Sequence, residues 1–151
     1  MPRGARHFGW PLWLVAAATS SCGATGNEGC VYDGPSCVAF QQDFAAYSSW
    51  ERVEIGSAPL AGHPTGNRYL RVNRRPPAGS TEWPVGTIIV KVIEPSATHP
   101  TTDLFAMVKR GEGYNATGAR DWEFFTLGLS TAGAPVITAR GLDPSTGDIY
   151  I

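Results

Sequence analysis

Six short runs rich in β-branched, aromatic and aliphatic residues recur along the chain from Trp50 onward, and they are the feature that most constrains its fold. Several of them alternate apolar and polar residues, which is the period of a half-buried β-strand. Glycine and proline, 18 and 12 of the 151 residues, fall largely between the runs, as expected for turns. The runs are WERVEIG from Trp50, NRYLRVN from Asn67, GTIIVKVI from Gly86, LFAMVKR from Leu104, WEFFTLGL from Trp122 and PVITAR from Pro135.

A helix is predicted before these strands. Phe40, Phe44 and Tyr47 recur at positions i, i+4 and i+7 of the segment VAFQQDFAAYSSW, which puts them on one helix face. One or two helices and about six strands predict a single antiparallel sheet. The predicted fold class is therefore α+β or mainly β.

The N-terminus has the layout of a secretory signal. Two arginines precede an apolar run from Phe8 to Ala18, which is far shorter than the roughly 20 residues of a membrane span. Small residues then lead to Cys22 and resemble a bacterial lipobox. Residues 1–21 are therefore predicted to be removed and Cys22 to be lipidated, so that acyl chains attach the protein to a lipid membrane. The alternative is ordinary cleavage nearby, which leaves Cys22 unmodified.

This layout predicts the periplasmic face of a bacterial membrane as the location, or secretion if no lipid is attached. Gly23 follows the cysteine where Asp would direct retention at the inner membrane, so the outer membrane is favoured. Residues 22–38 then provide the lipid attachment, a tether and a small cysteine loop. Residues 39–151 form the predicted folded domain.

The remaining cysteines, Cys30 and Cys37, flank the short loop CVYDGPSC. Gly34 and Pro35 favour a turn that brings the two ends together, and an exported protein meets an oxidising compartment. A disulfide between Cys30 and Cys37 is therefore predicted. A metal site is less favoured, since two thiols need further ligands and the nearest histidine is His63.

The charge balance excludes one class of partner. The chain has 12 basic and 13 acidic residues, and the signal removes two arginines, which leaves 10 − 13 = −3. Beyond the Arg74-Arg75 pair there is no basic cluster, so nucleic acid is not expected as a partner.

Several sequence blocks in this order resemble the cytochrome P-460 family of bacterial haem proteins. A helix leads into W-x-x-V, a loop with His beside Gly precedes a strand ending in Asn, and G-T-x-x-V-K, M-V-K-R-x-x-G-Y-N and D-W-E-F-F follow. The similarity covers roughly residues 39–129. The blocks are Trp50–Val53, His63–Asn73, Gly86–Lys91, Met107–Asn115 and Asp121–Phe125.

The resemblance implies a small periplasmic haem protein. In this family, a C-x-x-C-H motif near the C-terminus holds the haem through thioethers, and its histidine is the proximal ligand. In the name-giving members, which oxidise hydroxylamine, the lysine of G-T-x-x-V-K is also bonded to the porphyrin. Related members bind gases such as nitric oxide. Lys91 matches that lysine by position, although a lysine in mid-strand usually projects into solvent.

This chain departs from the family at the haem-attachment motif. No cysteine follows Cys37 and no histidine follows His99, so this sequence excludes thioether attachment. No covalent haem is expected, whereas haem bound in another way is implied by the resemblance. Two interpretations stay open: a haem-free descendant, or a chain whose C-terminal motif is missing from this sequence.

Other residues were weighed as site candidates. His63 and His99 precede prolines in loops, and with Asp103 their spacing fits no standard metal motif. Three acids near the expected pocket are candidates for proton transfer, with solvated carboxylates as the default: Glu112, Asp121 and Glu123. Five aromatic residues are expected to build the core rather than stack on a ligand: Trp83, Tyr114, Trp122, Phe124 and Phe125.

Three functional hypotheses follow, and whether the protein is an enzyme stays open. The first is a lipid-anchored, non-catalytic domain that binds a small molecule or a protein partner. The second is a haem oxidoreductase or gas sensor that binds haem non-covalently, with His63 as the first ligand to test. The third is a cytochrome whose C-x-x-C-H motif lies beyond Ile151.

Overall fold

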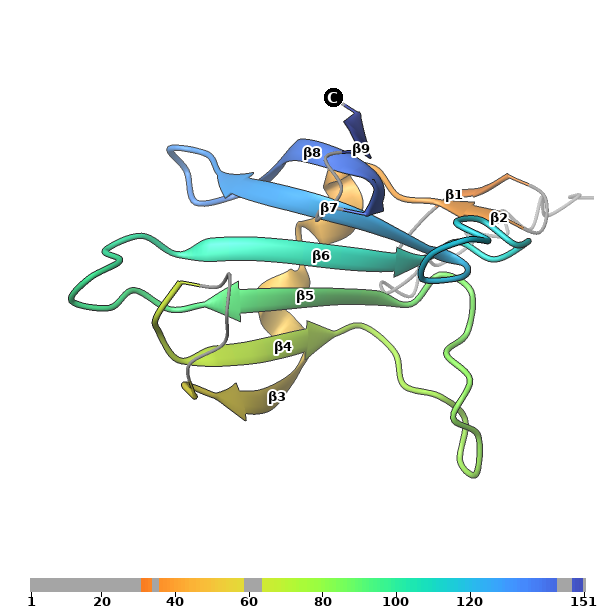
Figure 1. Ribbon diagram of the computed structural model, residues 1–151, viewed down its shortest axis with the longest axis horizontal. Helices are drawn as coiled ribbons and strands as arrows, with labels where there is room; N and C mark the ends of the chain where they lie inside the picture. The colour runs from red at the N-terminus through yellow and green to blue at the C-terminus, as the bar shows by residue number, and fades with distance from the viewer. Residues whose placement is uncertain (1–30, 34–35, 59–63, 144–147, 151) are drawn as a thin grey trace, which may run out of the picture.

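The computed structural model describes residues 31–33, 36–58, 64–143 and 148–150, and its fold is mainly β (Figure 1). Seven strands form one antiparallel sheet, in which spatial order follows sequence order. Two shorter strands form a separate hairpin. The strands are β1 (Val31–Asp33), β2 (Ser36–Val38), β3 (Glu51–Gly56), β4 (Arg68–Val72), β5 (Ile88–Ile93), β6 (Asp103–Lys109), β7 (Trp122–Leu129), β8 (Pro135–Asp143) and β9 (Asp148–Tyr150).

The six predicted runs are confirmed as strands β3 to β8, and the predicted single antiparallel sheet is confirmed with them. Each run pairs with the next one along the chain, because a short turn returns an antiparallel strand beside its predecessor. Strands β1, β2 and β9 were not predicted. Each has three residues, which is too short for an alternating pattern to be recognised.

The predicted helix is wrong in type. Two 3₁₀ helices, η1 (Gln41–Phe44) and η2 (Tyr47–Ser49), replace one longer α-helix. The backbone of Phe40 is extended, and its N–H donates to the Asp43 carboxylate at 2.7 Å, so the first turn begins after it. Phe40 therefore leaves the predicted helix face and is 44 % exposed, whereas Phe44 is fully buried.

The core lies on one face of the sheet, between the strands and the two 3₁₀ helices, which are behind the sheet in Figure 1. Phe44 packs against Phe125 with ring centroids 5.2 Å apart. Burying a large apolar side chain stabilises a fold by about 1.5–3 kcal/mol, so this cluster is the main source of stability. Its buried strand residues are Ile88, Val90, Val92, Leu104, Ala106, Val108, Phe125 and Leu127.

An ionic cluster closes one end of this core. The Glu123 side chain is 2 % exposed, and its carboxylate accepts hydrogen bonds from Arg110 at 3.2 Å and from Arg140 at 2.7 and 2.9 Å. Arg140 also donates to the carbonyl of Ala39 at 3.1 Å. The expectation that Glu123 is solvated is therefore wrong. Its position opposite Val108 directs it to the core face.

We expect Glu123→Gln to lower the free energy of unfolding by about 3 kcal/mol, because the substitution leaves two partly buried guanidinium groups without their counter-charge. Urea unfolding followed by tryptophan fluorescence measures this change. Glu82→Gln is the matched control, since Glu82 is exposed and surface substitutions change stability by roughly 0.5 kcal/mol or less. Equal losses in the two variants would contradict a structural role for the Glu123 cluster.

Candidate functional site

Two rows of side chains cross the sheet face opposite the core. Directly paired residues of an antiparallel sheet lie on the same face, so the strand register defines each row. We call these two rows the Lys91 face. The first row is Val53, Leu70, Lys91, Phe105, Thr126 and Ala139, and the second is Val72, Ile89, Met107, Phe124 and Gly141.

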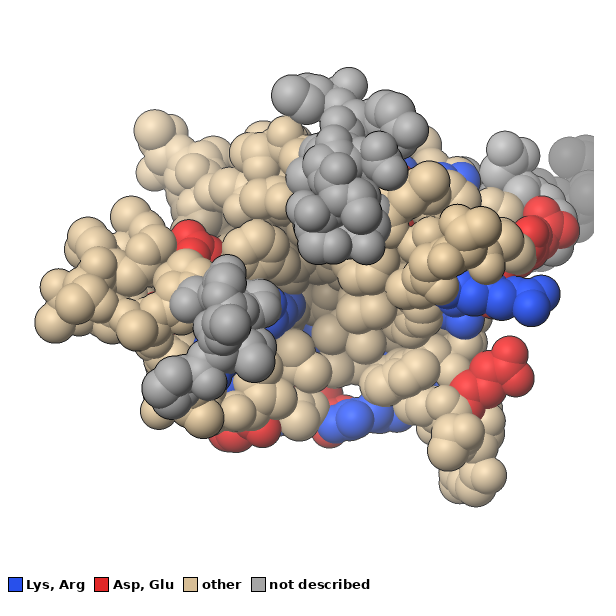
Figure 2. Space-filling model, in the orientation of Figure 1, with Lys and Arg blue, Asp and Glu red and all other residues tan. Residues whose placement is uncertain are grey.

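The Lys91 face is strongly apolar. Phe105, Met107 and Phe124 are only half-buried there, whereas the solvent-facing side of an antiparallel sheet normally carries polar residues. Figure 2 views this face, and the visible surface of its described residues is mostly tan. Val72 and Ile89 of the second row are themselves buried, with 3 % and 9 % of their surface exposed.

Lys91 occupies the centre of this face. It is paired with Leu70 on β4 and Phe105 on β6, and its Nζ lies 5.0 Å from the centroid of the Phe105 ring. Burial lowers the pKa of Lys91, and the Arg68 guanidinium lowers this pKa further. The expectation that a mid-strand lysine projects freely into solvent is therefore wrong here, because its neighbours on both sides are large and apolar.

Arg68 is a second cation on the same side of the sheet. It is paired with Ile93, two residues beyond Lys91, which makes Arg68 and Lys91 diagonal neighbours roughly 7–8 Å apart at their Cα atoms. Arg68 is only 6 % exposed and donates to the carbonyl oxygens of Gly56, at 3.3 Å, and Ala58. Carbonyl oxygens satisfy its N–H groups but leave its positive charge in place.

Asp103 and Glu51 are carboxylates on this side of the sheet. Asp103 is paired with Ile93 in the sheet, and its Oδ2 lies 2.9 Å from His99 Nε2. Glu51, at the β3 edge, accepts two hydrogen bonds from Arg75 at 2.8 and 2.9 Å. Glu51 is therefore engaged away from the centre of the Lys91 face, whereas Asp103, two residues before Phe105 on β6, is a diagonal neighbour of Lys91.

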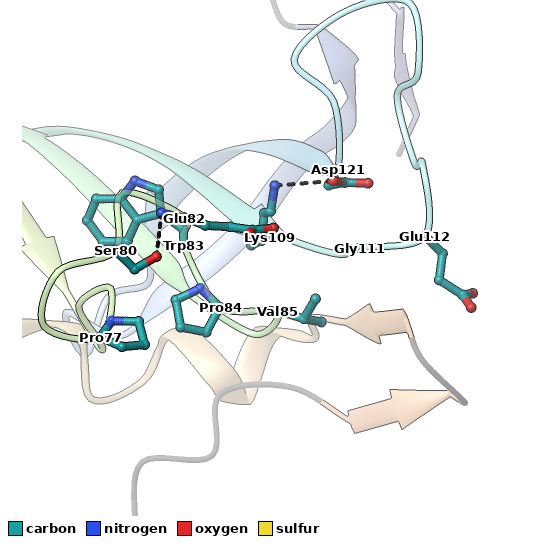
Figure 3. Close-up of a pocket in the computed structure, with 10 residues that line it drawn as sticks. All are labelled: Pro77, Ser80, Glu82, Trp83, Pro84, Val85, Lys109, Gly111, Glu112 and Asp121. Atoms are coloured by element: carbon teal, nitrogen blue, oxygen red, sulfur yellow. Dashed lines mark hydrogen bonds and ion pairs between the residues drawn. The ribbon is translucent and has the colours of Figure 1, made fainter.

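A separate cleft of about 420 Å³ lies between the loop before β5 and the turn before β7 (Figure 3). Lys109 points towards Asp121 in this cleft, with Nζ 3.2 Å from Oδ2, whereas the side chain of Glu112 points away. Lys109 is thus engaged in an ion pair. The lining residues are Pro77, Ser80, Glu82, Trp83, Pro84, Val85, Lys109, Gly111, Glu112 and Asp121.

The turn beside this cleft has a structural role. Asn115 is buried, and its amide donates to the carbonyls of Trp122, at 3.2 Å, and Leu142, at 2.6 Å. Burial raises the pKa of Asp121, but the Gly113 N–H and the Lys109 ammonium outweigh this effect and hold it below its ordinary value. The backbone has positive φ at Glu112, Asn115 and Asp121, so these hydrogen bonds hold a conformation that is uncommon for residues other than glycine.

The histidine candidates do not gather into a site within the described residues. Thr101 Oγ1 lies 3.1 Å from His99 Nε2, the same nitrogen that faces Asp103, so His99 does not link a hydroxyl to a carboxylate as a catalytic triad requires. No group of three metal-ligating side chains is present in the described part of the chain. His63 lies outside that part.

Of the three cysteines, Cys37 belongs to the described residues, so the structure tests only part of the cysteine predictions. Cys37 on β2 is fully buried and is disulfide-bonded. Cys22 and Cys30 lie outside the described residues, so their lipidation and pairing stay predictions. Within the ranges described, no helix is long and apolar enough to cross a membrane.

Sequence reasoning found Lys91 but missed its neighbours. Arg68 lies 23 positions earlier in the chain, and only the register of β4 against β5 brings the two together. Alternation within GTIIVKVI was the available signal, since it places Lys91 between Ile89 and Ile93 on one side of the strand. The expectation that Phe124 builds the core is wrong, because it faces the Lys91 side, whereas Phe125 is in the core.

No protein-family model, no curated protein and no solved structure matches this chain. Membership of the cytochrome P-460 family therefore stays a prediction from the sequence blocks.

Lys91→Met keeps an apolar stem and removes the charge. Because the folded pKa of Lys91 is lowered, the unfolded chain holds more protons between that pKa and the ordinary value of 10.5. The parent protein therefore gains stability relative to the variant as pH rises through this window. We expect Lys91→Met to be more stable at pH 7, by an amount that shrinks as pH approaches 10.5, in urea unfolding at a series of pH values.

Lys109→Met is the control, since the chain has two lysines after the predicted signal. It loses the ion pair with Asp121 and should be less stable than the parent by up to about 1 kcal/mol. A stability difference between Lys91→Met and the parent that stays constant with pH would contradict a desolvated ammonium at position 91.

Proposed function

We propose that this chain is an exported, lipid-anchored domain of the cytochrome P-460 type that binds a ligand or partner on its Lys91 face without covalent haem. The Lys91 position is the family's haem-crosslinking position. In this function the chain retains the binding surface of such a domain and lacks the catalysis that covalently held haem supports.

The observation that carries this proposal is the position of Lys91 at the centre of an apolar sheet face. Partial burial lowers the pKa of Lys91, because it penalises the charged form of the ammonium. Half-buried aromatic and sulfur-containing side chains beside it, Phe105, Met107 and Phe124, offer a flat apolar floor. Such a floor suits a flat or extended apolar ligand.

The residues fit haem only in part. The apolar floor suits the body of a porphyrin, but the two thioether cysteines of the family motif have no counterpart after Cys37. Within the described residues the histidine is His99, which is engaged with Asp103 and Thr101. Covalent haem and the family's proximal histidine therefore do not fit this chain.

The second candidate function is a gas sensor or oxidoreductase that binds haem non-covalently. What favours it is His63, the other histidine that remains after the predicted signal, which belongs to the sequence block resembling the family's His-Gly loop. A neutral imidazole is a suitable haem ligand.

Visible absorbance distinguishes these functions. The mature chain is expressed in a periplasm able to mature c-type cytochromes, and oxidised and reduced spectra are recorded. We expect a folded protein without a Soret band. A band that is lost on denaturation would support non-covalent haem, and His63→Ala should then abolish it. A band that survives denaturation would indicate covalent haem, most simply through Lys91, and would overturn the haem-free proposal.

The lipid anchor has its own test. We expect the parent chain to incorporate labelled palmitate and to sediment with membranes, because several acyl chains give stable membrane attachment. Cys22→Ser should lose both properties, whereas Cys30→Ser should keep the label. Equal labelling of parent and Cys22→Ser would contradict lipidation at Cys22.

A further inference from the structure

We propose that the outer edge of β3 pairs with the same edge of a second copy of this chain, so that the two sheets join across a two-fold axis at Val53. This inference goes beyond the proposed function and does not depend on a ligand at the Lys91 face. It names the partner and the register of the two strands.

β3 is an edge strand of the described sheet. It pairs with β4 on one side, and no other described strand pairs with it. Figure 1 accordingly shows β3 at the outer margin of the sheet. The backbone N–H and C=O groups on the outer side of an edge strand can pair with a strand of another molecule.

Two hydrogen bonds between β4 and β5 define which backbone groups face outward. The Asn73 N–H donates to the Ile88 carbonyl at 3.2 Å, and the Glu94 N–H donates to the Asn67 carbonyl at 2.9 Å. Both bonds join residues that are directly opposed in the β4–β5 register. Bonded positions alternate along an antiparallel strand, so odd-numbered β4 residues direct their backbone to β5 and even-numbered ones to β3.

The same alternation applies to β3. Leu70 is even-numbered and opposes Val53, so Val53 directs its N–H and C=O groups to β4. Its two neighbours, Arg52 and Glu54, therefore direct theirs to the outer side. A second antiparallel strand at this edge would form its hydrogen bonds with Arg52 and Glu54.

The charges of these two residues select one register. Bonded residues oppose bonded residues, so Arg52 of one copy can oppose Arg52 or Glu54 of the second copy, or Glu54 can oppose Glu54. Like charges directly opposite each other are destabilising, whereas opposite charges are stabilising. The favoured register therefore forms the Arg52–Glu54 pair twice, with Val53 at the two-fold axis. Each pair also exchanges two main-chain hydrogen bonds.

Arg52 is already held in position for this pairing. Its guanidinium lies over the Tyr69 ring, 3.5 Å from the centroid, and 3.6 Å from the Glu94 carboxylate. Little further side-chain freedom is therefore lost when a second strand arrives. Its Nε donates to Glu54 of the same strand, so the terminal nitrogens carry the N–H groups that can reach the carboxylate of the second copy.

The favoured register also covers apolar surface. Val53 is half-buried and would lie opposite Val53 of the second copy, in the closer type of antiparallel pair. Ile55, near the end of the same strand, is 47 % exposed. A second strand would remove part of this apolar surface from water.

The geometry limits the association to two copies. Regular pairing of β3 ends at the irregularity between Glu54 and Gly56, so the paired segment is short. The contact uses the same edge in both copies and is therefore closed by its two-fold axis.

Sedimentation velocity tests the pairing on the mature chain carrying Cys22→Ser, so that no acyl chain contributes to association. We expect a monomer–dimer equilibrium between about 1 µM and 1 mM protein. Arg52→Glu and Glu54→Arg should each weaken the dimer by about tenfold or more, because each makes both cross-strand pairs like-charged. An equimolar mixture of the two variants brings opposite charges together in both pairs and should restore the dimer.

Arg120→Glu is the control, since it makes the same change of charge at an exposed position before β7 and should dimerise as the parent does. Circular dichroism confirms that each variant keeps its sheet. A parent that stays monomeric would overturn the inference and show that the edge charges only prevent association. A dimer that Arg52→Glu does not weaken, a mixture of folded variants that stays monomeric, or assembly beyond two copies would also overturn it.

Discussion

The register of β5 against its two neighbours is the constraint on which the rest of the structure depends. Side chains alternate between the two faces of a strand, so a slip of one residue would exchange the core face with the Lys91 face. In the observed register, Val90 and Val92 enter the core, while Lys91 lies between Leu70 and Phe105. The hydrophobic core and the candidate site therefore lie on opposite faces of the same sheet, and one strand register determines both.

Polar side chains hold this register at the ends of the strands. Asn73 accepts a hydrogen bond from the Ile88 N–H at 2.7 Å and donates to the Gly86 carbonyl at 3.2 Å, so its amide fixes where β5 begins beside β4. Asn115 does the same for β7 and β8 through the carbonyls of Trp122 and Leu142. Both asparagines belong to blocks that resemble the cytochrome P-460 family, and their contacts are structural.

The residues that hold the strand register differ from the C-x-x-C-H residues that attach haem in the family. This difference explains physically how a sequence that resembles the family can fold without the haem-attachment motif. The side chains described above that determine strand pairing and core packing lie between Trp50 and Arg140, and they contact one another. Glu123, for example, is held by Arg110 and Arg140 alone.

The sequence by itself determined strands β3 to β8, because alternation and turn residues are local properties that can be recognised within six to eight positions. It also showed that no C-x-x-C-H motif occurs within residues 1–151. The proximity of Arg68 to Lys91, the burial of Glu123 and the departure of Phe40 from the predicted helix face were decided by the tertiary structure. Each depends on contacts between distant segments, or on which face of a strand meets the core, and no local pattern carries that information.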